Sequence, residues 1–395
     1  MSLTRFQERI ARAQAIMVAK EIDLLLISPG SNFFYFTNHD AHSSERTYLL
    51  IVPKSGKPRL VLPALEKLGA EEKLGSGCDY FAWSDAEGSS GILAAALPEA
   101  HRVHNLAGDG IDVTSWKDGK RMSTAPMLLK VAVDNQMWSG HLLDVQTLLG
   151  HTEWIKGTEV IKPLRIAKSS DEIAIMKQAA AIADKTLAEL TTQKFSGRTE
   201  LEIASEIQRL LLANGQQAMQ FCIVGSGPNG AMPHHGASDR VIQPGDAIVL
   251  DFGGTYNGYQ SDMTRIAAVR GGTIDPEFEK VFETVDAANR AAHAAARPGV
   301  SCESVDKAAR DVIIAAGYGE YFTHRTGHGL GIDVHEDPYI VSGNTEVLEL
   351  GMAFSIEPGV YLPGRFGVRM EDIAIVTESG AENINLSPHP VYWVD

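Results

Sequence analysis

The first part of the chain alternates a helical pattern with short apolar runs. Hydrophobic residues recur with a helical period over residues 3–20, and the continuous apolar run at 22–28 predicts a buried strand. Two more runs of strand type, at 47–53 and 59–63, are separated by a turn-forming segment at 54–57. Strands interleaved with helices in this way predict an α/β layer domain.

Beyond residue 163 the pattern changes to longer helices with clear start and stop signals. Ser169 with Glu172, and Thr199 with Glu202, have the spacing of capping boxes, in which each partner bonds the other's backbone amide. Two further helices are expected between an Asp-Pro or Ser start and a Gly end. These signals predict helices at 170–190, 200–214, 275–299 and 301–317.

The same part of the chain carries runs of β type that cluster together instead of alternating with the helices. Such clustering favours an α+β domain over a parallel dinucleotide-binding sheet. A G-x-G-x-x-G match at 225–230 opens no helix, so it lacks the structural context of a dinucleotide site. We therefore expect a smaller α/β domain at 1–163 and an α+β domain at 164–395. The β-type runs lie at 221–224, 247–252, 261–269, 352–357 and 368–376.

Composition and charge narrow the class of protein. Of the 395 residues, 44% are hydrophobic and 22% are charged, as in ordinary soluble globular proteins. The net charge of −15 disfavours nucleic acid or an anionic membrane as a partner. The three cysteines are widely separated, the first residues contain no apolar leader, and no apolar run approaches the length of a membrane span. We expect a cytoplasmic protein.

Two aspartates lie on either side of a predicted β-hairpin. Asn257-Gly258, between two β-like runs, is the strongest short hairpin signal. If this pair forms the turn, Asp262 lies opposite Gly253, and Asp251 lies two residues further along on the same face. Unpaired buried charges are costly, so two carboxylates on one face of an apolar hairpin indicate a shared site.

Two glutamates occupy mirrored positions in a second predicted hairpin. Glu357 and Glu371 are equidistant from Gly364, so an unbulged hairpin would place them directly opposite each other. Ionised carboxylates in that position repel one another. Such a pair persists only if the two groups share a proton or hold a cation.

A glycine-punctuated segment supplies three histidines, His324, His328 and His335. The glycines beside His328 allow close approach of the backbone, as around a ligand. With the two hairpins this gives a donor set of two Asp, one His and two Glu, and the charge of −4 on the four carboxylates matches two divalent cations. An oxygen-dominated set with one imidazole suits Mn²⁺ first, with Co²⁺, Fe²⁺ or Zn²⁺ as alternatives.

These segments together resemble a known family. D-F-G-G-x5-Q-S-D-M-T-R, T-G-H-G-L-G-I-D-V-H-E-D-P, S-I-E-P-G-V-Y and G-V-R-M-E-D are similar, in order and spacing, to the metallopeptidases that include prolidase, aminopeptidase P and methionine aminopeptidase. The resemblance covers roughly residues 165–379, and segments 31–36 and 45–47 are similar to the creatinase-type N-terminal domain of prolidases. It implies a pita-bread α+β catalytic domain, preceded by a creatinase-like domain, in a homodimer.

The resemblance also implies a role for each candidate residue. Glu357 would serve as general base towards a hydroxide bridging two metal ions, and Asp262 and Glu371 would bridge the ions. The five implied metal ligands are Asp251, Asp262, His328, Glu357 and Glu371.

On the substrate side, His234 matches the family's substrate-contacting histidine, although the adjacent His235 leaves that choice open. His335 matches the histidine that bonds the developing oxyanion or the peptide carbonyl. Arg369 is the candidate clamp for a substrate carboxylate, with a structural pairing to Asp372 or Glu371 as the alternative.

The implied activity is cleavage of the bond between an N-terminal residue and a following proline, in a small peptide. A dipeptidase and an aminopeptidase P both fit, because loop insertions and the partner subunit decide how far the site is closed. Two other functions stay open, since a fold does not fix its function. One is hydrolysis of a small non-peptide amide or amidine, and the other is a non-catalytic binding module on the same fold.

Overall fold

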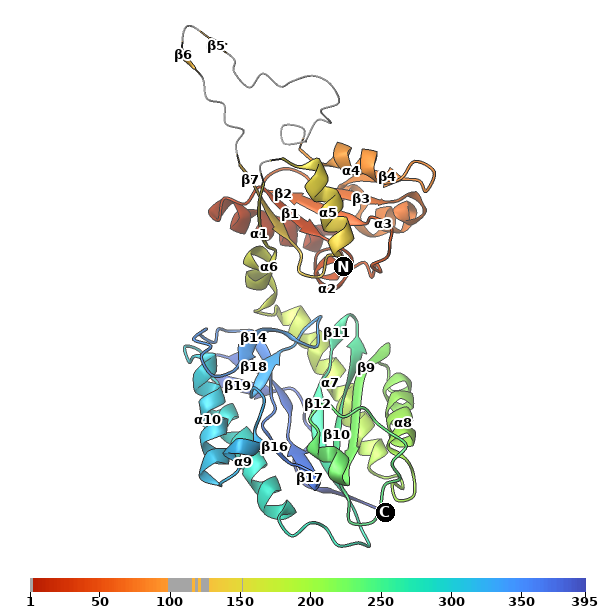
Figure 1. Ribbon diagram of the computed structural model, residues 1–395, viewed down its shortest axis with the longest axis vertical. Coiled ribbons are helices and arrows are strands. Elements are labelled where there is room, and N and C mark those ends of the chain that lie inside the picture. Colours follow the sequence, from red (N-terminus) through yellow and green to blue (C-terminus); the bar gives the residue numbers. More distant parts are fainter. Residues whose placement is uncertain (1–2, 99–115, 118–119, 122–127, 151) are drawn as a thin grey trace. The chain divides into compact units, whose positions relative to one another are not determined.

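The computed structural model describes residues 3–98, 116–117, 120–121, 128–150 and 152–395 (Figure 1). Contacts between residues divide the chain into two compact units, Met1–Leu164 and Arg165–Asp395, here called the N-terminal and C-terminal units. Within the described part, no helix is long and apolar enough to cross a membrane.

The described part of the N-terminal unit is built on a six-stranded mixed sheet. Its strands are β1 (Leu24–Ile27), β2 (Leu49–Pro53), β3 (Arg59–Pro63), β4 (Asp79–Trp83), β7 (Leu129–Val133) and β8 (Thr152–Lys156), in the order β4-β3-β2-β1-β7-β8. A separate pair is formed by β5 (Trp116–Lys117) and β6 (Lys120–Arg121). The helices are α1 (Leu3–Ala19), α2 (Ser31–Thr37), α3 (Lys67–Leu74), α4 (Ser90–Ala96), α5 (Ser139–Leu148) and α6 (Thr158–Arg165). The predicted first helix and first three strands are present, which confirms the α/β layering.

Residues 165–395 are all described and contain the predicted helices α7 (Ser170–Leu190), α8 (Glu200–Ala213), α9 (Phe278–Ala295) and α10 (Cys302–Ala315). Both predicted capping boxes are formed, because Ser169 and Thr199 each accept a hydrogen bond from the backbone amide of the glutamate three residues on. Gly299 and Gly317, after α9 and α10, have φ angles of 84° and 89°, the left-handed conformation that ends helices.

The strands of the C-terminal unit form two five-stranded sheets and one two-stranded ribbon. The first sheet contains β9 (Ala218–Ser226), β10 (Ala247–Tyr256), β11 (Tyr259–Gln260), β12 (Met263–Val269) and β20 (Tyr392–Val394). The second contains β13 (Gly327–Gly329), β14 (Glu336–Ile340), β15 (Ala353–Ile356), β18 (Asp372–Thr377) and β19 (Gly380–Asn383). The ribbon is β16 (Gly359–Leu362) with β17 (Phe366–Arg369). Hairpins with segregated helices confirm the predicted α+β class.

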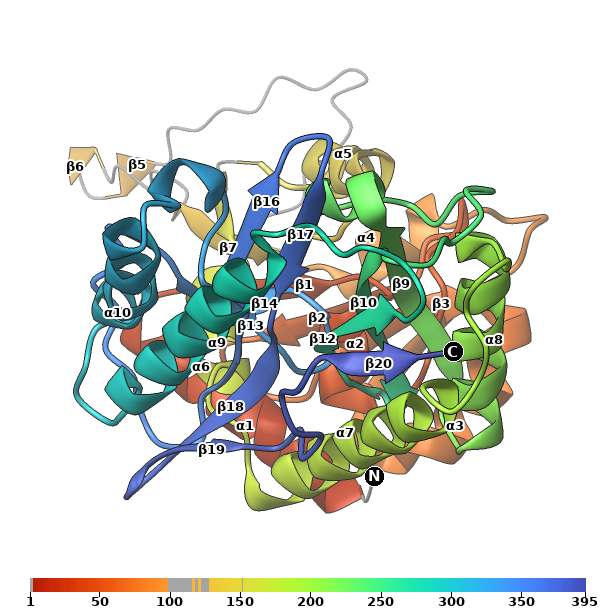
Figure 2. The same cartoon turned by 90° about the horizontal axis from the view of Figure 1, so that it is seen from below.

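Each sheet is covered by its own pair of helices, so that the C-terminal unit has two halves (Figures 1 and 2). α7 and α8 share a core with β10 and β12, and α9 and α10 share a core with β15 and β18. Side chains alternate along a strand. Phe354 and Ile356 therefore face α9 and α10, which leaves Ser355 and the following Glu357 to face the first half.

The same alternation applies to the first sheet. Ile248, Leu250 and Phe252 pack against α7 and α8, whereas Val249 lies in the core of the second half. Asp251 shares the face of Val249 and is therefore directed into the space between the halves. Polar residues of both sheets meet in this interior.

The prediction of one strand at 368–376 was wrong. β17 ends at Arg369 and β18 begins at Asp372, so Met370 and Glu371 lie between two strands. The chain changes partners there, because Glu371 forms an isolated bridge with Thr264 of the first sheet, with its amide donating to the Thr264 carbonyl at 3.3 Å.

Arg265 joins three segments at this change of partners. Its guanidinium is fully buried and makes five hydrogen bonds. It donates to the Glu371 carbonyl and to Asp372 Oδ1, both at 2.6 Å. It also donates to the carbonyls of Thr264, Ser387 and Pro388. Arg265 therefore fixes the backbone of Glu371 against β12 and the C-terminal segment.

We expect Arg265→Met to lower the free energy of unfolding by about 3–5 kcal/mol, because it removes the buried cation beside Asp372 and the donor to four backbone carbonyls. Lys307→Met also removes one cation, but Lys307 is 72% exposed in its pair with Asp311, and its loss should cost about 0.5 kcal/mol. Denaturation in urea measures both. Equal losses in the two variants would contradict the role given to Arg265.

Candidate metal centre

The first hairpin has the predicted turn and register. Asn257 and Gly258 both have positive φ angles, 48° and 81°, as a two-residue type I′ turn requires. Asp251 lies opposite Thr264, and continuation of this register places Asp262 opposite Gly253. Both aspartates are buried, with 7% and 3% of their surface exposed. A Cβ at Gly253 would lie 2.0 Å from the Ser261 carbonyl oxygen, so only glycine fits beside Asp262.

The second hairpin holds the two glutamates in register from both sides. Ile356 pairs with Asp372 in the second sheet, and Gly359 pairs with Arg369 in the ribbon. Each of these pairs is symmetric about Gly364, and Glu357 and Glu371 lie at the mirrored positions between them. The predicted opposition of the two acids therefore holds although the strand is interrupted.

His328 enters the same space from β13. Its Nδ1 lies 3.1 Å from the Gly329 carbonyl oxygen, which can only accept, so Nδ1 carries a proton. The other nitrogen, Nε2, lies 3.1 Å from Glu357 Oε1 and 3.8 Å from Asp262 Oδ2. An imidazole nitrogen that faces two carboxylates is placed to share a cation with them.

The ligand atoms of the cluster are close enough for one ion. Oxygen atoms of Asp262 and Glu371 and a nitrogen of His328 all lie within 4.8 Å of one another. Asp251 Oδ1 and Asp262 Oδ1 are buried and have no hydrogen-bond partner among the described residues. Buried carboxylate oxygens without donors are rare in proteins.

Burial and mutual repulsion shift the pKa values of these acids. Burial, followed by repulsion from the neighbouring carboxylates, raises the pKa of Asp262 and of Glu371 well above the usual range. Burial also raises the pKa of Asp251, although the Arg369 guanidinium opposes it. For Glu357, burial is outweighed by the His328 hydrogen bond and charge, which lower its pKa to about 2.

This arrangement fits divalent cations. Three buried carboxylates, the partly buried Glu357 and an imidazole nitrogen that faces them form an oxygen-rich donor set, in which two oxygens have no donor among the described residues. Cations would remove the repulsion that raises the acids' pKa values and would give the unpartnered oxygens a bonding partner.

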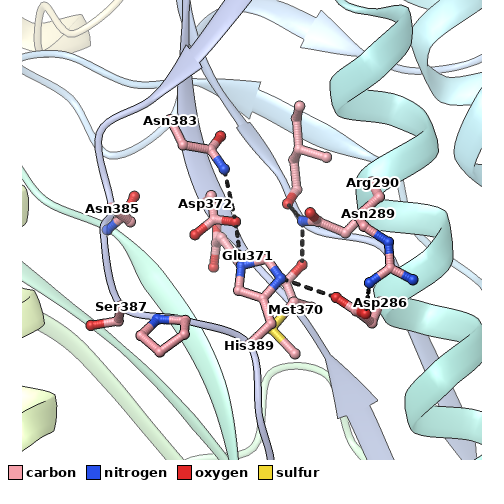
Figure 3. Close-up of polar contacts among 12 residues, drawn as sticks. Asp286, Asn289, Arg290, Met370, Glu371, Asp372, Asn383, Asn385, Ser387 and His389 are labelled. Atoms are coloured by element: carbon pink, nitrogen blue, oxygen red, sulfur yellow. Dashed lines mark hydrogen bonds and ion pairs between the residues drawn. The ribbon is translucent and has the colours of Figure 1, made fainter.

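A polar network behind the cluster holds the two glutamates in place (Figure 3). Asn289 of α9 donates to the Ile356 carbonyl at 2.8 Å and to the Met370 carbonyl at 3.3 Å. These are the residues immediately before Glu357 and Glu371, so one amide group spans both strands at the level of the acids.

The adjoining Asp372 is part of the same network. It accepts a hydrogen bond from His389 Nε2 at 2.7 Å, while His389 Nδ1 lies 3.1 Å from Asp286. Asn383 donates to Asp372 Oδ2 at 3.3 Å, so several donors surround this carboxylate (Figure 3). The network fixes the strand next to Glu371 without a contact to the Glu371 carboxylate itself.

The two adjacent histidines have different environments. His235 Nε2 lies 2.7 Å from Glu200, a fully buried acid that also accepts hydrogen bonds from Ser226 and Ser238. His234 is exposed on the cavity wall and has no hydrogen bond to any described residue. The geometry therefore favours His234 for contact with a substrate, and His235 for holding the loop.

Arg369 does not have the environment expected of a free clamp. It is buried, and it donates to Asp251, to Tyr361 at 2.7 Å and to Thr264 at 3.2 Å. A fourth hydrogen bond reaches the Pro233 carbonyl at 3.2 Å. The structural alternative named Asp372 or Glu371 as its partner, but Asp372 pairs with Arg265 instead.

His335 lies on the cavity wall beside His328, with 4.0 Å between the ring centroids. Burial, together with the charges of His328 and Arg325, lowers the pKa of His335 to about 4. The next residue, Glu336, is bound by Arg165 and, at 2.8 Å, by Lys168. These buried cations fix the loop that presents a neutral His335.

The five candidate ligands line one cavity of about 770 Å³ within the C-terminal unit, together with His234, His235, His335 and Arg369. Besides the predicted residues, the lining includes His324 and Arg325, to which the sequence analysis gave no role. His324 Nε2 lies 2.9 Å from the Tyr361 hydroxyl. The only signal for His324 was its place in the three-histidine segment, and no sequence signal marked Asn289 or Glu200.

Residues 174–378 match Metallopeptidase family M24, and residues 9–167 match the Creatinase/Prolidase N-terminal domain. The chain belongs to metallopeptidase family M24. Membership implies an enzyme that binds a divalent metal.

Some relatives of this M24 peptidase match nearly its whole length. It is 41% identical over 395 residues to a probable dipeptidase PepE of Mycobacterium tuberculosis, covering 98% of this chain and 96% of the relative. It is 34% identical over 371 residues to an Xaa-Pro dipeptidase of Lactobacillus helveticus, covering 91% of each. A prolidase from Thermococcus sibiricus has a similar crystal structure, with a TM-score of 0.86 and 36% identity over 100% of this chain and 99% of that one. The predicted pita-bread and creatinase-type fold is thereby confirmed.

We expect Mn²⁺ to raise the melting temperature of the metal-free M24 peptidase, because bound cations relieve the repulsion among its buried acids. At 100 times the dissociation constant the gain in stability is about 2.7 kcal/mol. Asp262→Asn should abolish most of this gain, whereas Asp311→Asn, at a surface ion pair, should retain it. Thermal unfolding with and without Mn²⁺ measures the difference, and equal gains in both variants would count against the site.

We expect Glu200→Gln to weaken stability in a pH-dependent way. Burial alone would raise the pKa of Glu200, but hydrogen bonds led by those from Ser226 and Ser238 lower it from 4.5 to about 2. Its contribution, about 2–3 kcal/mol from this shift, is present above pH 4.5 and is lost as the pH falls towards 2.

Urea denaturation at pH 7 and at pH 3 tests this expectation. The gap between wild type and Glu200→Gln should narrow at the lower pH. Glu349→Gln, at an exposed position, is the control and should show little gap at either pH. A gap for Glu200→Gln that does not change with pH would refute the ionised, hydrogen-bonded state of Glu200.

Proposed function

We propose that this M24 peptidase is an Xaa-Pro dipeptidase that uses two divalent cations, Mn²⁺ first among them. The observation that carries the proposal is the set of four carboxylates, three of them buried, and one imidazole in a single cavity, with two carboxylate oxygens that have no donor among the described residues. The names of its relatives, Xaa-Pro dipeptidase and prolidase, support the substrate class. A cytoplasmic homodimer remains a prediction from the sequence.

The proposed ligands are Asp251, Asp262, His328, Glu357 and Glu371. Asp262, Glu371 and His328 would hold one ion together, because a ligand atom of each lies within 4.8 Å of the others; the family resemblance implies that Asp262 and Glu371 would also hold the second. When bound, the cations supply Lewis-acid polarisation of the substrate carbonyl and a nucleophile derived from water at neutral pH. The oxygen-rich donor set favours Mn²⁺ over metals that prefer sulfur or several imidazoles.

Glu357 is proposed to accept the proton of the attacking water. Its low pKa keeps it ionised at neutral pH. Its Oε1 is already engaged by the Ser355 hydroxyl at 3.0 Å and faces His328 at 3.1 Å, so Oε2 is the oxygen assigned to the proton. The same atom would then return the proton to the departing proline nitrogen.

His335 and His234 are proposed to orient the substrate. A pKa of about 4 keeps His335 neutral at neutral pH, so it can donate a hydrogen bond to the carbonyl oxygen without adding a fixed charge. His234 is unengaged and lies on the wall of the same cavity. Neither contact needs an N–H group on the residue after the scissile bond, and proline lacks that group.

The test is hydrolysis of Ala-Pro and of Ala-Pro-Ala by metal-stripped protein, before and after addition of Mn²⁺. We expect metal-dependent cleavage of Ala-Pro and much slower cleavage of the tripeptide. Loss of the base in Glu357→Ala should reduce the rate at least ~10²-fold. Glu382→Ala, in an exposed pair with Lys177, is the matched control and should keep full activity.

The other outcomes separate the alternatives. Preferred cleavage of Ala-Pro-Ala would identify an aminopeptidase P instead of a dipeptidase. If Mn²⁺ binds and neither peptide is cleaved, the proline-peptidase proposal is wrong, and small non-peptide amides become the substrates to test.

A further inference from the structure

The cavity of the M24 site has two arginines in its lining, Arg325 and Arg369. A dipeptide substrate brings a C-terminal carboxylate into a site that already contains four acids. One of the two guanidinium groups is the natural partner, because its planar fork bonds a carboxylate through two parallel N–H donors.

Arg369 is not available for this task. Its side chain is 4% exposed, and each of its three nitrogens donates to a protein acceptor: Nε to Thr264, Nη1 to Tyr361 and Pro233, and Nη2 to Asp251. These hydrogen bonds engage four of the five N–H donors of the guanidinium, so Arg369 cannot offer a substrate carboxylate two parallel donors without giving up a protein acceptor.

Arg325 has the opposite environment. Its guanidinium makes no hydrogen bond and no ion pair with any residue in the described part of the chain, and it is only half-buried. Its one defined contact is with the aromatic ring of Tyr339, whose centroid lies 4.7 Å from Cζ. An aromatic ring engages the face of a guanidinium, so the N–H donors at its edge stay free for an acceptor.

The position of Arg325 is fixed by the strands that carry His328. Arg325 lies two positions before the first residue of β13, with Thr326 between them. Tyr339, on β14, is the cross-strand partner of His328. The neighbouring Thr326 amide donates to the Ile340 carbonyl at 2.9 Å, which continues the ladder beside Arg325. The stacked arginine is therefore held at a defined distance from the metal cluster.

Arg325 also lies on the side of the cavity that holds His335. Arg325, His328 and His335 all line the same cavity, and the rings of His335 and His328 lie with their centroids 4.0 Å apart. In a dipeptide the carboxylate follows the scissile bond by a single residue, a span of about 3.3–3.6 Å. A cation that shares the cavity with His335 is thus in the right region for that carboxylate.

We infer that Arg325, stacked on Tyr339, binds the C-terminal carboxylate of the substrate and makes the enzyme selective for dipeptides. This inference rests on the proposed Xaa-Pro dipeptidase function and replaces Arg369 as the clamp. Arg369 is then a positioning residue, which holds Asp251. A third residue in the substrate would replace the carboxylate by a neutral amide and would lose the paired contact.

Hydrolysis measures one arm of the test, with Mn²⁺-loaded full-length enzyme. The substrates are Ala-Pro and its C-terminal amide, which share the scissile bond and differ only in the carboxylate. Wild type should prefer Ala-Pro by about 10- to 100-fold in kcat/KM, the range of a charge-assisted hydrogen bond. Arg325→Gln should remove most of this preference through KM for Ala-Pro, while the amide is cleaved within about threefold of wild type.

Two further variants define the role of the guanidinium. Arg325→Lys keeps the charge but not the fork, and it should recover part of the preference. Arg270→Gln is the matched control, because Arg270 also stacks on an aromatic ring, Trp393, but lies outside the cavity lining. This control should keep the wild-type preference. Melting temperatures confirm that each variant is folded.

The second part of the test measures the affinity of a ligand that the enzyme cannot cleave. The probe is an analogue of Ala-Pro in which a methylene replaces the scissile carbonyl, compared with its C-terminal amide by calorimetry. Carboxylate preference in wild type that disappears in Arg325→Gln supports the assignment even if no peptide is cleaved, in which case only the proposed function fails. An unchanged preference in Arg325→Gln, in either arm, overturns the assignment of Arg325.

Discussion

Mutual repulsion among four carboxylates enclosed in one cavity is the constraint to which the C-terminal unit is adapted. Asp251, Asp262 and Glu371 are all less than a tenth exposed, and nothing in their own strands neutralises them. Left alone, such a group of acids would favour an opened or protonated state. The fold opposes opening of the cluster, because the acids come from two separate sheets and each sheet is packed against its own pair of helices. Repulsion between the acids therefore has to move a packed sheet in order to separate them.

The two buried arginines, Arg265 and Arg369, support this cluster in different ways. Arg265 bonds mainly backbone carbonyls and so determines where Glu371 lies, whereas Arg369 bonds the Asp251 carboxylate and so adjusts the charge. Asn289 makes a third kind of contact, to the carbonyls that precede both glutamates. Three other groups are proposed to contact the substrate. The side chains of His234, His335 and Arg325 differ from the supporting residues because they donate no hydrogen bond to any described residue. A site that binds metal first and substrate afterwards needs rigidly held metal ligands. Beside them it needs side chains whose hydrogen-bonding groups are still available to the substrate.

The sequence predicted local geometry well and long-range partners poorly. Capping boxes, the Asn257-Gly258 turn and the symmetry about Gly364 depend on residues close in the chain, and each was found as expected. The break of the strand at Met370 was missed, because it arises from a bridge to Thr264, more than a hundred residues away. For the same reason Arg369 looked like a free clamp, since its partners Asp251 and Pro233 are remote in sequence. Asn289, within an ordinary amphipathic helix, carried no local signal at all.

The two ladders that flank Glu357 and Glu371 give the pairing of these acids a form of redundancy. Ile356 with Asp372 and Gly359 with Arg369 independently specify the same alignment. An insertion or deletion at the ribbon tip, near Gly364, would disturb only one of the two constraints, and the ladder on the sheet side would still align the acids. A change in the length or composition of the tip would therefore leave the two glutamates opposite each other in space.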